Sequence, residues 1–362
     1  MKTGKSLTEL AAEIERQAES KKDYIAPAQS MGLVVVEKEA RFALPGIGDF
    51  GITPHAHGQL AEYAGIPKAY YDRMKAEDPD LLARNVNRWV HAEKGKRMVR
   101  TLDGDMRGLM SDRFRALDNY DLADAVFPVL KEAGAVIASA DITTSKFYLK
   151  CLCPWLDREL PVPPGLKMGV GHTFFPRKVQ GAVTISNSEI GVGSLFIAPG
   201  SFELQCTNYA TYRDEGYSKL HIGRKNGAEE GISRYLTDET KRIEDAAVWS
   251  KVRDVLRAVM DGRVLDEIVG KLVDARGDVI EGDPVKVIEA FAKKNSFTEA
   301  QKGGLLKHFT NSGEASRFGM HWAVTRLSQD EEDYDEASRL ERLGGEVIEL
   351  PKHDWEVLAK AA

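Results

Sequence analysis

The sequence predicts an α+β fold, in which a strand-rich central antiparallel or mixed sheet with helices is flanked by N-terminal helices and a C-terminal helical region. From Ala135 to Cys206 the apolar residues recur with a period of two, which is typical of strands. After Gly227 the apolar spacing becomes helical almost to the end of the chain. This order lacks a regular alternation of strands and helices, which argues against a doubly wound parallel sheet.

We expect four segments along the chain. Residues 1–52 should form an N-terminal helix and strand segment, because Ser6 and Glu9 make a capping box ahead of an amphipathic stretch. Residues 53–227 should form an α+β core with a basic hairpin and the central sheet. The helical spacing predicts a C-terminal helical region over 228–350, and residues 351–362 are expected to be a tail.

Turn and cap signals divide the core segment. Asp103-Gly104 lies between two alternating runs and predicts a hairpin over 97–115. Asn119 is expected to cap a helix that Gly134 ends. In the C-terminal region a helix over Glu332–Leu343 is expected to end at Gly344.

The composition is that of an ordinary folded protein, with 43% hydrophobic and 29% charged residues among 362. Three cysteines are too few for a disulfide framework, so a reducing compartment is expected. No signal-peptide core follows the N-terminus, and no apolar run is long enough to span a membrane. These features predict a cytoplasmic protein without a membrane partner.

No complete catalytic motif is present, so we assign no catalytic residue, metal or cofactor and regard a non-enzymatic role as the better expectation. Cys151 and Cys153 have the wrong spacing for zinc and fit one buried face of a strand. His55 and His57 diverge on a helix. Asp103 and Asp112 could serve a metal-dependent nuclease, although Asp103-Gly104 is already explained as a turn.

Charge is distributed unevenly along the chain, whose formal net charge is −6. Between Arg84 and Arg115 nine Lys or Arg residues face four acids, which gives a local charge of +5. From Ser328 onwards eleven acids and four bases give −7. A basic face on an acidic protein is compatible with a polyanion partner, although both stretches could equally be solvated surfaces.

The candidate nucleic-acid contacts fall into two groups of basic and aromatic residues. Guanidinium groups suit phosphates and aromatic rings suit unstacked bases, so the combination is typical of single-strand binding. The first group is Arg84, Arg88, Trp89, Arg97, Arg100, Arg107, Arg113 and Arg115. The second group is Tyr212, Arg213, Tyr217, Lys219, Arg224 and Lys225.

Seven motifs, in order over about residues 50–350, resemble a phage and plasmid-like family that is described as a domain of unknown function. They are Gly65–Tyr71, Asn85–Trp89, Arg107–Asn119, Asn187–Gly191, Cys206–Asn208, Trp322–Arg326 and Tyr334–Gly345. The resemblance implies an origin on mobile elements but supplies no activity and no catalytic residue.

The basic clusters and the resemblance together predict a single-stranded DNA-binding and annealing protein of a mobile element, similar in role to Rad52-like recombinases. Such proteins assemble into rings or filaments, so a homo-oligomer is expected with single-stranded DNA as the partner. The hypothesis requires the arginines to converge in one solvent-facing groove. The alternatives are a metal-dependent nuclease and a non-enzymatic interaction or antirestriction protein.

Overall fold

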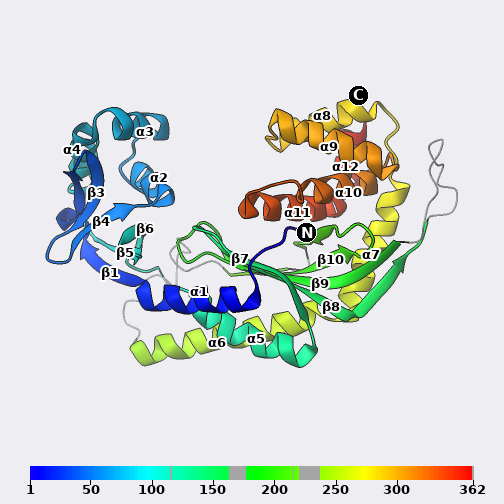
Figure 1. The fold of residues 1–362 in the computed structure, drawn as a ribbon, viewed down its shortest axis with the longest axis horizontal. Coiled ribbons are helices and arrows are strands. Elements are labelled where there is room, and N and C mark those ends of the chain that lie inside the picture. Colours follow the sequence, from blue (N-terminus) through cyan, green and yellow to red (C-terminus); the bar gives the residue numbers. More distant parts are fainter. Residues whose placement is uncertain (115, 163–176, 215, 220–236, 361–362) are drawn as a thin grey trace.

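A computed structural model describes residues 1–114, 116–162, 177–214, 216–219 and 237–360. The fold is α+β, as predicted, but its strands form two separate six-stranded sheets instead of one central sheet (Figure 1). Each sheet has its own hydrophobic core, and a third core lies among the C-terminal helices.

The first sheet has the strand order β1-β5-β6-β4-β3-β2. Adjacent strands in this sheet are antiparallel, except for β4 and β6, which are parallel to each other. The elements of this part are α1 (Leu7–Ser20), β1 (Lys22–Pro27), β2 (Gly32–Val36), β3 (Glu39–Leu44), β4 (Gly48–Ile52), α2 (Pro54–Tyr63), α3 (Lys68–Glu77), α4 (Pro79–Val90), β5 (Lys96–Leu102) and β6 (Asp105–Ser111).

The first sheet contains strands from both the expected segment 1–52 and the expected segment 53–227, so these two segments do not fold as separate units. Strand β1 pairs with β5 and β4 pairs with β6, so the two sides of the boundary expected at residue 52 share one core with α2, α3 and α4. The hairpin therefore belongs to the first sheet and not to the strands that follow it. The capping box of α1 forms as predicted, with Ser6 and Glu9 bonding each other's backbone amides.

The second sheet is antiparallel, with the order β11-β10-β9-β8-β7 and β12 paired to β10. Its elements are α5 (Asn119–Ala133), β7 (Val136–Ile142), β8 (Phe147–Leu160), β9 (Arg177–Asn187), β10 (Leu195–Glu203), β11 (Tyr209–Thr211) and β12 (Tyr217–Lys219). The predicted apolar face of β8 is confirmed, because Phe147, Leu149, Cys151 and Cys153 are all buried. Asp118, rather than Asn119, occupies the N-cap of α5, and Gly134 ends that helix in the left-handed conformation.

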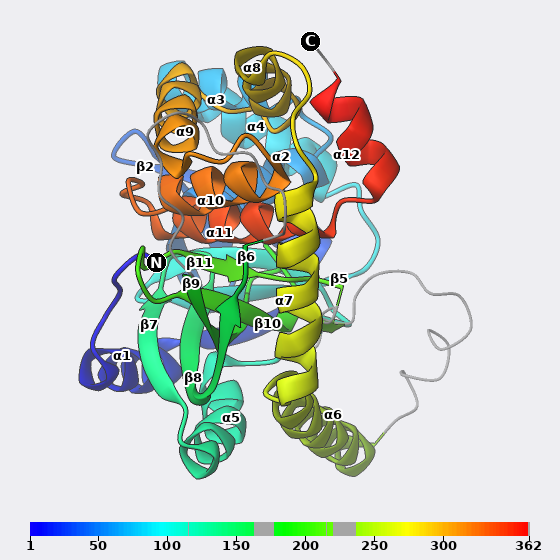
Figure 2. The same ribbon diagram turned by 90° about the vertical axis from the view of Figure 1, so that its right-hand side faces the viewer.

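The C-terminal helices are α6 (Asp238–Val259), α7 (Gly262–Gly277), α8 (Pro284–Lys294), α9 (Glu299–Ser312), α10 (Arg317–Leu327), α11 (Tyr334–Glu349) and α12 (Lys352–Ala359). Helices α10 and α11 lie over one side of the second sheet, whereas α1, α5 and α6 lie on its other side (Figure 2). The expected tail contains α12, whose Trp355 is buried in the third core.

Helix α11 does not end at Gly344, contrary to the prediction. It continues to Glu349, and both glycines of the pair lie inside it at close contacts. A Cβ at Gly344 would come within 2.3 Å of Thr325 Cγ2, and one at Gly345 within 1.9 Å of the Thr211 carbonyl oxygen. The glycines therefore serve close packing instead of ending the helix.

Within the described residues, no helix is both long enough and apolar enough to cross a bilayer.

Candidate nucleic-acid interface

Helix α4 carries the part of the predicted site that faces solvent. Asp78 caps it by accepting a 2.9 Å hydrogen bond from the Leu81 amide, and Pro79 occupies its first turn. Its apolar stripe, which includes Leu82 and Val86, is buried in the core of the first sheet. The opposite side of the helix is left to polar residues.

The helix is attached to the edge strand β2 by side-chain hydrogen bonds. Asn87 accepts from the Leu33 amide at 2.6 Å and donates to the Leu33 carbonyl at 2.8 Å. The ring of His91 bonds the Met31 carbonyl at 3.0 Å. A Cβ at Gly32 would meet Asn87 Oδ1 at 2.5 Å, so glycine is needed there. These bonds satisfy an otherwise open sheet edge and fix α4 in place.

Arg84, Arg88 and Trp89 are all exposed on α4. The arginines are four residues apart and project from one face. Neither has an ion pair or hydrogen bond with the residues that the structure describes. Trp89 is 54% exposed and lies about 100° around the helix from Arg88. This arrangement offers two free guanidinium groups beside an accessible indole.

Arg97, on β5, is half-buried and already has an aromatic partner. Its guanidinium carbon lies 4.4 Å from the ring centroid of Tyr63, at the end of α2. This cation–π contact holds the guanidinium group against the Tyr63 ring.

The expectation that Arg100 and Arg107 contact phosphates is wrong, because both are buried. Arg100 donates to Asp23 at 2.9 Å, to Asp118 at 2.8 Å and to the Glu189 carbonyl at 2.7 Å. Arg107 donates to the Glu189 carboxylate at 2.6 Å. Residues that follow the hairpin cover this side of it and supply Asp118 and Glu189, while β1 supplies Asp23, so these carboxylates occupy the guanidinium donors.

These arginines belong to a buried ionic network that joins the two sheets. Lys21 donates to the second oxygen of Asp118 at 2.6 Å, and the Asn119 amide donates to Glu189 at 2.7 Å. Burial opposes ionisation of Asp118, but Arg100 and Lys21 outweigh it and hold the pKa of Asp118 below its usual value. Asp118 is therefore ionised at neutral pH, and its pairs with Arg100 and Lys21 are structural in character. Arg113 is half-buried with a bonded partner, and Arg115 lies outside the described residues.

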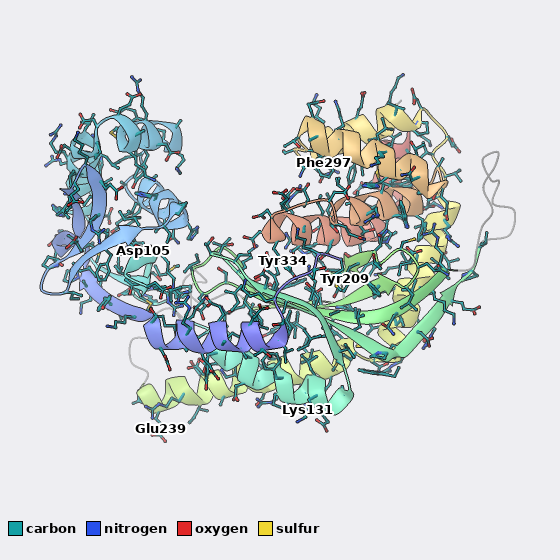
Figure 3. All side chains as sticks on the ribbon, viewed as in Figure 1. Asp105, Lys131, Tyr209, Glu239, Phe297 and Tyr334 are labelled. Carbon is teal, nitrogen blue, oxygen red and sulfur yellow. The ribbon has the colours of Figure 1, made fainter. Side chains whose placement is uncertain are left out.

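The second predicted cluster does not join the first. Tyr212 is buried and its hydroxyl bonds Ser201 at 2.7 Å, so its expected stacking role is also wrong. Arg213 is exposed but pairs with Glu346 at 3.3 Å, and Tyr217 on β12 is half-buried. Figure 3 labels Tyr209 in the strand just before this cluster, and α4 lies in the opposite half of the molecule.

For Lys219 the structure places only the backbone, in β12, while Arg224 and Lys225 lie outside the described residues. The single groove formed by both clusters is consequently not seen in the described part of the chain.

Asp103 and His57, two residues considered for metal-dependent alternatives, bond other side chains of the first sheet and its helices. Asp103 accepts two hydrogen bonds from Arg16 and one from Ser20, at the turn predicted from Asp103-Gly104. Nδ1 of the buried His57 lies 2.8 Å from the Tyr71 hydroxyl, and burial lowers the pKa of His57 to about 4. No cluster of three metal-ligating side chains occurs among the described residues.

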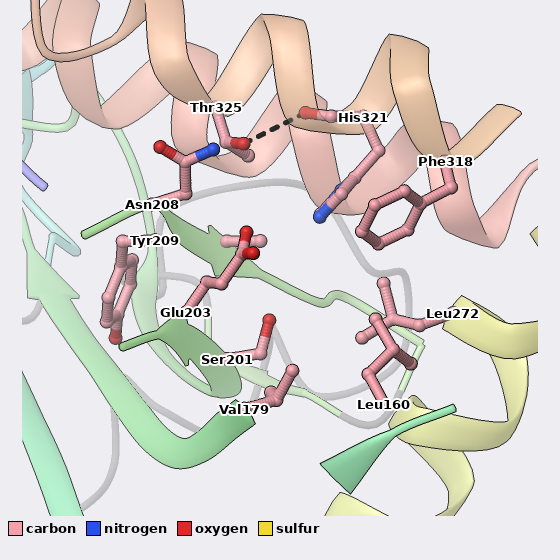
Figure 4. A pocket seen from close by; sticks show the side chains of 11 residues that line it. Leu160, Val179, Ser201, Glu203, Asn208, Tyr209, Leu272, Phe318, His321 and Thr325 are labelled. Carbon is pink, nitrogen blue, oxygen red and sulfur yellow. Dashed lines mark hydrogen bonds between the residues drawn. The ribbon is translucent and has the colours of Figure 1, made fainter. Parts of the chain in front are cut away.

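A small pocket of mixed polar and apolar lining between the second sheet and α10 was not predicted (Figure 4). Its lining includes Ser201, Glu203 and His321. His321 Nδ1 donates to the Gly344 carbonyl at 2.8 Å, and burial lowers the pKa of His321 to about 4. Glu203 is paired with Arg177 at 2.6 Å. A neutral imidazole beside a paired carboxylate gives this pocket no excess charge for an anionic ligand.

Comparisons of the chain with protein-family models, with curated proteins and with solved structures found no match.

Proposed function

We propose that the protein binds single-stranded DNA through the exposed side of α4. The observation that carries the proposal is the pair Arg84 and Arg88, which lie one helical turn apart and have no ion pair or hydrogen bond within the described part of the chain. The exposed Trp89 follows them. The arginines would contact successive backbone phosphates, while the indole would stack on a base at the end of the helix. A duplex would not present an unstacked base to Trp89.

This proposal uses a smaller binding surface than the continuous basic groove that the sequence suggested, and it does not include strand annealing. Arg100 and Arg107 are occupied by Asp23, Asp118 and Glu189, so they add no phosphate contacts. Two phosphate contacts on a single strand predict a slope of about −1.4 for log affinity against log salt concentration. Binding should consequently be weak near physiological salt and clear at low salt.

The test is fluorescence anisotropy of a labelled oligothymidine over a salt series, with a duplex of equal length in parallel. Arg84→Ala/Arg88→Ala should remove most of the salt slope. Trp89→Ala should weaken binding at every salt concentration, because stacking contributes about 1–3 kcal/mol per base.

The matched control is Arg253→Ala/Arg257→Ala on α6, which removes two arginines at the same i, i+4 spacing from another part of the surface. Binding that is absent at low salt, or that falls equally in both double variants, would refute the assignment to α4.

A further inference from the structure

A second group of cations lies away from α4, where the turn between β7 and β8 meets α11. Asp335, in the first turn of α11, accepts from Thr143 Oγ1 at 3.1 Å and from Ser145 Oγ at 2.6 Å. Two neutral hydroxyl donors therefore bond Asp335 and fasten the turn to the helix.

Lys146 ends this turn and is half-buried, yet it has no ion pair or hydrogen bond from its ammonium group among the described residues. Its stem passes over the glycine loop Gly191–Gly193. A Cβ built on Gly193 would lie 3.3 Å from Lys146 Cε, so a larger residue there would crowd the lysine. The turn and the loop thus hold the ammonium group in a restricted position.

Arg342 projects from the same face of α11 as Asp335, because the two are seven residues or nearly two turns apart. It is also half-buried and makes no ion pair or hydrogen bond with the described residues. The pKa of Lys146 is lowered, first by burial and next by the charge of Arg342, while Asp335 opposes the shift. Lys146 and Arg342 thus have no ion-pair partner among the described residues, and together with the carboxylate of Asp335 the three groups carry a net positive charge.

Half-burying two like charges is unfavourable unless an anion compensates them. Elsewhere the protein supplies carboxylates to its buried cations, as it does for Arg100 and Arg107. At this position the carboxylate of Asp335 is already bonded by the hydroxyls of Thr143 and Ser145. We propose that Lys146 and Arg342 form a binding site for a phosphate-type oxyanion beside the glycine loop Gly191–Gly193. The site does not depend on the proposed role of α4.

The experiment is titration calorimetry of the full chain with inorganic phosphate at constant ionic strength. Lys146→Ala and Arg342→Ala should each weaken phosphate binding about tenfold, since each removes one charge-assisted contact. Neither should lower the melting temperature without phosphate, because neither side chain bonds another group in the ranges that the structure describes. Lys131→Ala on α5 removes an equal charge elsewhere and should bind phosphate like the parent protein.

Competition with an oligothymidine that lacks a terminal phosphate identifies the source of the oxyanion. Displacement of phosphate assigns the site to phosphodiesters, whereas no displacement assigns it to free phosphate or a phosphomonoester. Arg84→Ala/Arg88→Ala should keep phosphate binding, so the α4 proposal can fail without affecting this one. Absence of phosphate binding in the parent protein, or equal binding by Lys146→Ala and Arg342→Ala, would overturn the inference.

Discussion

Replacing Arg100 by methionine tests whether the buried ionic network holds the two sheets together. The substitution keeps an unbranched apolar side chain but removes hydrogen bonds to Asp23, Asp118 and the Glu189 carbonyl. Loss of one partner from a buried ion pair costs about 3–5 kcal/mol. Lys21 still compensates Asp118, and Asp23 is 34% exposed and can be hydrated. We therefore expect a loss near the lower end, about 3 kcal/mol.

Urea unfolding at pH 7 measures this loss, with Arg16→Met as the matched control. Arg16 pairs with Asp103 at 2.7 Å, but both side chains are nearly half exposed, so its replacement should cost less than about 1 kcal/mol. An Arg100→Met variant that loses no more stability than Arg16→Met would refute the reasoning.

The same variant makes a prediction about acid unfolding. The native pKa of Asp118 lies below its unfolded value, so its contribution to stability is complete above the unfolded pKa and disappears as the pH falls through the native one. Without Arg100 the native pKa of Asp118 rises, and the acid unfolding midpoint should move to higher pH. An unchanged midpoint, followed by circular dichroism, would show that Asp118 does not depend on Arg100.

Three further substitutions test separate parts of the fold. Asn87→Ala should destabilise the protein by about 1–2 kcal/mol in urea unfolding, because it leaves the amide and carbonyl of Leu33 without their side-chain partner. Arg84→Ala, which removes an exposed side chain from the same helix, should change stability little. Gly345→Ala should lower the melting temperature by several degrees, because the added Cβ would lie 1.9 Å from the Thr211 carbonyl oxygen. Gly270→Ala, at an open position of α7, should raise the melting temperature. Equal effects of the two substitutions would contradict the close-packing role of Gly345. Buried His321 has a native pKa of about 4, below its unfolded value, so stability should fall between about pH 6.5 and 4, and His321→Asn should flatten that part of the stability curve.

Local signals in the sequence predicted most of the individual elements. Ser6 and Glu9 located the start of α1, Gly134 the end of α5, and Asp103-Gly104 the turn of the β5–β6 hairpin. Each of these signals works through contacts within a few residues. Gly344 misled because the same residue type serves both helix termination and close packing, and only the neighbouring elements decide between them.

The local sequence pattern did not show which of the arginines are buried and which are exposed. Arg97 and Arg100 occupy one strand three residues apart, yet Arg97 lies half-exposed on Tyr63 whereas Arg100 is buried. The partners of Arg100 come from positions 18, 77 and 89 residues away in the chain. Whether an arginine of the hairpin is exposed or buried therefore depends on which residues from later in the chain pack against it, and local sequence does not reveal this. Arg84 and Arg88 were predictable because the amphipathic pattern of α4 itself places them outside.

The pairing of β1 with β5 has a consequence for how the protein is made. Lys22 lies opposite Thr101, and three helices separate β4 from β5. During synthesis β1 leaves the ribosome long before the strand that completes its hydrogen bonds, so the edge that pairs with β5 stays open until the hairpin emerges. Because distant strand pairing is slow compared with helix formation, α2, α3 and α4 should form first and the sheet should close around them.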